Sequence, residues 1–180
     1  MGNKAAFALF GMSGLLLLFS TYISLLPDVI ESTVEIEINY PKEDFINYLS
    51  DASNWEEWLF QEKVKYSEDW RTMKSGNTTG EGSVLKWFSE DIGDGALEIK
   101  KIDSDKIVFE RVSDDGSFTD RCYLNLQSNS DGLVIKMIDS LDLSANFFAR
   151  YEAQKEFYAQ DIDSSNFKVL KRLKFLLENK

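Results

Sequence analysis

The chain has 180 residues, with 31 Asp or Glu, 20 Lys or Arg and no His, so its net charge at neutral pH is −11. This acidity argues against nucleic-acid binding and against a flat contact with anionic lipid, because both surfaces are negatively charged. The absence of histidine excludes Ser-His and Cys-His nucleophile pairs and His-based metal motifs. The single cysteine, Cys122, excludes an intrachain disulfide and a multi-cysteine zinc site. We therefore expect no metal and no cofactor.

The first predicted element is an N-terminal transmembrane helix. Residues 5–26 carry no formal charge, and a helix of this length spans about 33 Å, enough for a hydrocarbon core of about 30 Å. The run is longer than the apolar part of a cleaved signal peptide, which is the alternative, and no small-x-small cleavage site follows it. The sequence thus favours a retained anchor over residues 1–30 and a separate domain over residues 31–180.

The orientation of this anchor follows from the few charges beside it. Lys4 lies before the apolar run, whereas Asp28, Glu31 and Glu35 follow it. Because positive charge is retained in the cytoplasm, we expect a single-pass membrane protein whose domain lies on the non-cytoplasmic side.

A strand and two short helices are predicted next. Residues 33–40 alternate apolar and polar side chains, which is typical of a strand with one buried face. Pro41 suits the first position of a helix that runs through Leu49. A second short helix follows, and either Ser53 or Asn54 can cap it.

The middle of the chain predicts an antiparallel meander, because short apolar runs alternate with turn residues. Residues 71–82 are polar and contain three glycines, so we interpret them as a loop. The predicted strands span residues 64–68, 83–90, 96–102, 107–112, 117–127 and 133–139.

From Ser144 onward the apolar period becomes helical. We expect a break at residues 160–163, after which Asp163 or Ser164 caps a final amphipathic helix that ends near Leu177. A sheet with one solvated face needs a cover on its apolar face, and this helix is the long element available. The sequence therefore predicts an α+β fold in which a curved antiparallel sheet wraps around a long C-terminal helix.

Four stretches carry a resemblance to a known superfamily. Residues 34–41 form an alternating strand that leads into a proline, residues 45–58 contain a helix and a tryptophan pair, residues 80–87 enter a strand through Gly-x-Gly, and residues 170–174 read LKRLK. In this order they resemble the SRPBCC or START-like superfamily, also called the helix-grip fold, and specifically its polyketide cyclase/dehydrase-like group. The likeness covers roughly residues 31–178.

This resemblance implies a cavity between the sheet and the C-terminal helix that binds a hydrophobic or amphipathic small molecule or a lipid. Membrane-tethered versions occur in the superfamily, so a transmembrane anchor does not conflict with it. The members include lipid carriers, cyclases and hormone receptors. The resemblance therefore implies a type of binding site but no single activity.

Five residues are the candidate ligand contacts. Arg111, Asp120 and Asp139 fall on strand faces whose other residues are apolar, and the predicted hairpin places Asp120 on the diagonal from Arg111, within reach of a long side chain. If these faces line a cavity, the three side chains are polar anchors in an apolar pocket; alternatively, they lie at strand ends in water. Trp58 and Trp87 line the same cavity or simply pack in the core.

Three functions are open at this stage. The first is a membrane-anchored domain that holds a hydrophobic ligand. The second is a cyclase/dehydrase-like enzyme in which Asp120 or Asp139, a Glu or a Tyr performs the acid–base work. The third is a non-catalytic interaction protein whose cavity is filled by its own side chains. Nothing in the sequence demands catalysis, and Cys122, which lies mid-strand among apolar residues, is expected to be an inert buried thiol.

Overall fold

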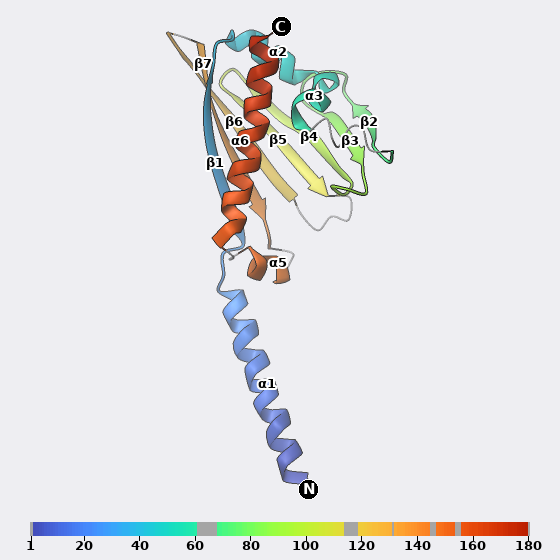
Figure 1. Ribbon diagram of the computed structural model, residues 1–180, viewed down its shortest axis with the longest axis vertical. Coiled ribbons are helices and arrows are strands. Elements are labelled where there is room, and N and C mark those ends of the chain that lie inside the picture. The colour runs from blue at the N-terminus through green and yellow to red at the C-terminus, as the bar shows by residue number, and fades with distance from the viewer. Residues whose placement is uncertain are drawn as a thin grey trace.

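The computed structural model describes residues 2–60, 68–113, 119–130, 132–144, 147–153 and 156–179. A seven-stranded antiparallel sheet with the strand order β1-β7-β6-β5-β4-β3-β2 curves around the C-terminal helix (Figure 1). The strands are β1 (Val29–Ile38), β2 (Arg71–Gly76), β3 (Ser83–Phe88), β4 (Gly95–Asp103), β5 (Lys106–Ser113), β6 (Thr119–Asn129) and β7 (Gly132–Asp142). The helices are α1 (Gly2–Ser24), α2 (Lys42–Ser50), α3 (Trp55–Leu59), α5 (Phe147–Glu152) and α6 (Glu156–Glu178), with a 3-10 turn, η1 (Ala52–Asn54). The predicted α+β architecture is confirmed.

Strand β1 has the alternation that its sequence predicts. Ile38 is buried, whereas Glu35 and Glu37 are exposed on the opposite face. The strand pairs antiparallel with β7, from Val29 opposite Asp142 to Ile38 opposite Leu133. The first strand of the chain therefore lies beside the last strand.

The two short helices α2 and α3 anchor one end of the sheet. Phe45, Leu49 and Trp55 are fully buried, and the Trp55 Nε1–H donates a hydrogen bond to the Leu49 carbonyl at 2.7 Å. Asn54 holds the N-cap position of α3, as predicted, but its side chain makes no capping hydrogen bond. The carboxylate of Asp51 instead accepts a hydrogen bond from the Ser53 N–H at 2.8 Å, so the capping begins earlier, at η1.

The prediction of a loop over residues 71–82 is also wrong in its first half, where the chain forms strand β2. This strand pairs antiparallel with β3, from Arg71 opposite Phe88 to Gly76 opposite Ser83. It lies at the edge of the sheet and is solvated on both faces, so it carries no apolar alternation. The predicted strand at residues 64–68 falls almost entirely outside the described residues.

Helix α6 is continuous, so the predicted break at residues 160–163 and the predicted caps at Asp163 or Ser164 are wrong. Asp163 lies within the helix, where its Oδ1 accepts a hydrogen bond from the Ser32 hydroxyl of β1 at 2.6 Å. This contact uses the carboxylate that would otherwise serve as a cap. The predicted amphipathic stripe is present, since Leu170, Leu173 and Leu177 are buried.

The N-terminal helix α1 extends away from the sheet and meets the rest of the chain at α5, where Phe19 and Tyr151 pack edge to face at 5.8 Å (Figure 1). No helix among the described residues is long and apolar enough to cross a membrane. The predicted transmembrane helix, and with it the single-pass location on the non-cytoplasmic side, is therefore wrong. The domain boundary near residue 30 stays a prediction.

The core lies between the concave face of the sheet and helices α2, α3 and α6. Phe109 at its centre packs edge to face against Trp55 and Trp58, with ring centroids 5.5 Å and 6.3 Å apart. Aromatic pairs in this geometry add about 0.5–1.5 kcal/mol beyond the area that they bury. They fix α3 over the middle of the sheet and so define one wall of the candidate site.

Candidate ligand-binding cavity

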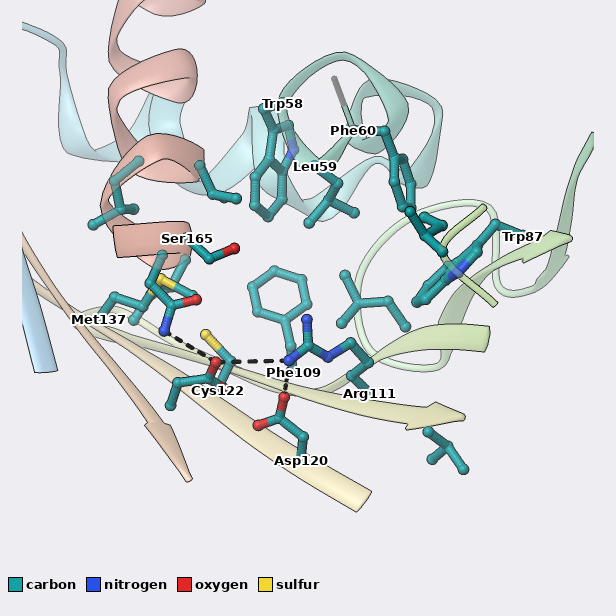
Figure 2. Close-up of a pocket in the computed structure, with 18 of the residues that line it drawn as sticks. Trp58, Leu59, Phe60, Trp87, Phe109, Arg111, Asp120, Cys122, Met137 and Ser165 are labelled. Atoms are coloured by element: carbon teal, nitrogen blue, oxygen red, sulfur yellow. Dashed lines mark hydrogen bonds and ion pairs between the residues drawn. The ribbon is translucent and has the colours of Figure 1, made fainter. Parts of the chain in front are cut away.

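A cavity of about 470 Å³ lies between the concave face of the sheet and helices α3 and α6 (Figure 2). This volume is within the range of about 300–1,000 Å³ that is typical of ligand pockets. Most of the lining is apolar and includes Trp58, Phe60, Trp87, Leu97, Phe109, Leu124, Met137 and Val169. The polar lining residues are Asp94, Arg111, Asp120, Cys122, Asp139, Ser165 and Asn166.

The register of three neighbouring strands brings a polar cluster together on the sheet side of the cavity. Arg111 of β5 lies directly opposite Asp120 of β6. Asp139 of β7 lies opposite Cys122, two residues further along β6. Because side chains alternate along a strand, all four point to the same face of the sheet. The predicted diagonal relation of Arg111 to Asp120 is therefore replaced by a direct cross-strand pair.

Arg111 forms ion pairs with both aspartates. Its Nη2 contacts Asp120 Oδ2 and lies 3.7 Å from Asp139 Oδ2 (Figure 2). Asp120 and Asp139 are 4% and 5% exposed, whereas the Arg111 side chain is 53% exposed because it borders the cavity. Burial lowers the pKa of Arg111, but the two carboxylates more than offset this, so its pKa is raised and it stays charged.

The two carboxyls cannot both ionise easily. Burial, followed by the neighbouring Asp139 carboxyl, raises the pKa of Asp120 to about 7, although Arg111 acts in the opposite direction. Asp120 Oδ1 is buried and has no hydrogen-bond partner among the described residues. A proton shared with Asp139 would satisfy this oxygen, since buried polar atoms are nearly always hydrogen-bonded. Near pH 7 Asp120 is therefore protonated in about half of the molecules, and Arg111 is the cation that both carboxyls contact.

A second polar group links the cluster to helix α6. The Asn166 amide donates hydrogen bonds to Asp139 Oδ2 and to Ser32 Oγ, both at 3.1 Å. Ser32 in turn donates to Asp163, as described above. The chain of hydrogen bonds fixes the orientation of Asp139 and ties α6 to β1 and β7, so the cavity has a defined wall on this side.

The two candidate tryptophans lie at different parts of the cavity wall. Trp87 Nε1–H donates a hydrogen bond to the Gly93 carbonyl at 3.1 Å, and its ring covers Gly95 so closely that a Cβ there would meet the ring at 2.4 Å. Trp58 Nε1 is buried without a hydrogen-bond partner among the described residues.

Burial raises the pKa of the Cys122 thiol well above its usual range, so Cys122 is not a reactive thiolate at neutral pH.

All five candidate residues line the same cavity. Their role in holding a ligand stays a prediction. Among the described residues, no group of three or more cysteine or acidic side chains is arranged to hold a metal ion.

Comparison with known proteins gives matches at the level of structure. No protein-family model and no curated protein matches the sequence. The KanY protein is 13% identical and has a TM-score of 0.59, with 83% of this chain and 97% of that chain covered. The protein CV1439 from Chromobacterium violaceum is 14% identical and has a TM-score of 0.57, with 84% of this chain and 99% of that chain covered. The di-domain ARO/CYC StfQ from the steffimycin biosynthetic pathway is 12% identical, with a TM-score of 0.58, 84% of this chain and 51% of that chain covered.

The chain has the helix-grip fold. At these low identities the comparison supports the fold and leaves the membership of a finer group, such as the polyketide cyclase/dehydrase-like proteins, as a prediction. It also leaves the ligand of this helix-grip domain to be inferred from its own cavity.

Sequence reasoning missed two polar residues of the helix-grip site, Ser32 and Asn166. Asn166 precedes Leu170, Leu173 and Leu177 on the apolar stripe of α6, and Ser32 has the same strand parity as the buried Ile38. A polar side chain on an apolar stripe requires a buried partner. This signal could have identified both residues.

Proposed function

We propose that this helix-grip domain binds an amphipathic small molecule, with its apolar body in the cavity and its polar end at Arg111. The observation that carries the proposal is a cavity of about 470 Å³ with an apolar lining and one charged guanidinium group on its wall. Apolar burial at about 25 cal/mol per Å² would drive binding, and the few polar groups would orient the ligand.

Native mass spectrometry of the full chain tests this proposal. The wild-type protein should retain a small molecule from its expression host or take one up from an extract of apolar metabolites. Ser165 of α6 lines the cavity (Figure 2), so Ser165→Trp should occupy part of the space and reduce the bound fraction. Ser164→Trp is the matched control, because Ser164 does not line this cavity. A wild-type protein that stays bare in both conditions would contradict the proposal.

A second function, acid–base catalysis on a bound carbonyl compound, is favoured by the pKa of about 7 at Asp120. A general base is most effective when its pKa is near the working pH. In this scheme the aspartate pair would accept a proton from the carbon beside a carbonyl, while Arg111 would donate a hydrogen bond to the oxygen that becomes the enolate.

Hydrogen–deuterium exchange at the carbon beside a ketone, followed by NMR in D2O, tests this second function. The wild-type protein should accelerate the exchange of 2-acetylnaphthalene, and Asp120→Asn should lose the acceleration. An exchange rate equal to that of buffer would limit the domain to binding.

A further inference from the structure

We infer that the cavity selects ligands whose polar end is uncharged and accepts a hydrogen bond, such as a ketone, ester or amide oxygen, and that it discriminates against carboxylates. The inference rests on the proposed binding function and adds the chemical class of the ligand.

The charges on the wall leave no excess positive charge for an anion. Arg111 is the single cation among the described lining residues, and it already contacts two carboxyls, Asp120 and Asp139. The remaining charged lining residue, Asp94, is also acidic. A ligand carboxylate would therefore enter a site whose one cation is already neutralised, and like charges brought together in an interface are strongly disfavoured.

The groups around this cluster add no positive charge to the cavity wall. Cys122 remains a neutral thiol because burial raises its pKa. Asp94 accepts a hydrogen bond from the Ser89 N–H at 2.9 Å, and Asp163 lies behind Ser32 with a further negative charge. A carboxylate could be accommodated only if the Asp120–Asp139 pair took up another proton, so its binding would be penalised above neutral pH.

An uncharged ligand oxygen is not repelled by these negative charges. The contacts of Arg111 with the aspartates use Nη2, and the side chain, which lines the cavity, is 53% exposed overall. A guanidinium group has five N–H donors, so donors remain for a ligand. A carbonyl oxygen can accept one of them without altering the charge of the cluster.

Calorimetric titration of the full chain at pH 8 with two probes of the same bicyclic body tests the inference. The probes are 2-acetylnaphthalene, which is neutral, and 2-naphthoate, which is a carboxylate. We expect the ketone to bind at least about tenfold more tightly than the carboxylate. A carboxylate that binds equally well or better would overturn the inference and leave the proposed binding function standing, whereas no binding of either probe would overturn both.

The variant Asp139→Asn tests the cause of the selectivity by a gain of affinity, which misfolding cannot imitate. It removes one carboxylate from Arg111 and keeps the shape of the side chain, so the affinity for 2-naphthoate, measured relative to that for the ketone, should rise at least about tenfold. Glu35→Gln, the same loss of charge at an exposed site on β1 that does not line the cavity, should change neither affinity. An unchanged affinity of Asp139→Asn for 2-naphthoate relative to the ketone would overturn the inference.

Discussion

The substitution Asp120→Asn should stabilise the protein more at pH 8 than at pH 5. In the folded protein the pKa of Asp120 is about 7, against an ordinary value of 3.8. The folded state therefore holds a proton that the unfolded chain has lost, and stability falls as the pH rises from about 4 to about 7. A shift of about 3 pH units corresponds to roughly 4 kcal/mol at pH 8, which Asn does not lose because it cannot ionise.

Urea denaturation at pH 5 and pH 8, followed by tryptophan fluorescence, measures this difference. At pH 8 the variant should be more stable by up to roughly 4 kcal/mol, or about 8–16 °C in melting temperature for a chain of this size. At pH 5 the gain should be smaller, roughly 2 kcal/mol, because the folded Asp120 is protonated while the unfolded carboxyl has already lost its proton. The control Glu35→Gln, at an exposed site, should show no such dependence on pH.

A variant that is equally or less stable than the wild type at both pH values would refute the reasoning. It would mean that Arg111 keeps Asp120 ionised throughout and that the carboxyl pair does not share a proton. The role of the carboxyl pair as a proton acceptor near neutral pH would then lose its physical basis, whereas a fully ionised pair would still disfavour a ligand carboxylate.

Three further substitutions test the packing around the cavity. Phe109→Ala removes a side chain that is 1% exposed and should cost about 3–5 kcal/mol in the free energy of unfolding; a cost under about 1 kcal/mol would contradict its central place in the core. Gly132→Ala should be more destabilising in urea than Gly80→Ala, because both positions have positive φ but only at Gly132 would the new Cβ meet a backbone oxygen, that of Ile38, at 2.2 Å. Asn166→Leu leaves buried hydrogen-bond partners unsatisfied and should cost about 1–3 kcal/mol at pH 7; an equal or higher midpoint in urea would show that its hydrogen bonds do not stabilise the fold.

The sequence predicted most of the sheet and the parity of its polar residues. Apolar alternation reports directly which side chains share a face, so Arg111, Asp120 and Asp139 could be placed together without knowledge of the turn between β5 and β6. Their separations could not be predicted, because a shift of register by one residue changes the partner of each side chain. The structure places Arg111 directly opposite Asp120 rather than on the diagonal.

The elements that sequence reasoning missed lack a local pattern of their own and depend on a partner elsewhere in the chain. Strand β2 is solvated on both faces, and only its pairing with β3 makes it a strand. Helix α6 continues through Asp163 because that carboxylate finds Ser32, which lies 131 residues away in the chain. Local patterns of charge and polarity cannot report such partners, and the same limit concealed Asn166.

The pairing of β1 with β7 has a consequence for the synthesis of the chain. Ile38 pairs with Leu133, 95 residues later. At a synthesis rate of about 5–20 residues per second, β1 waits roughly 5–20 s for its neighbour. Helix α6 follows β7 in the chain, so the concave face stays uncovered until α6 has also left the ribosome. We therefore expect a nascent chain truncated before β7 to require a chaperone, because the apolar concave face of its sheet remains exposed.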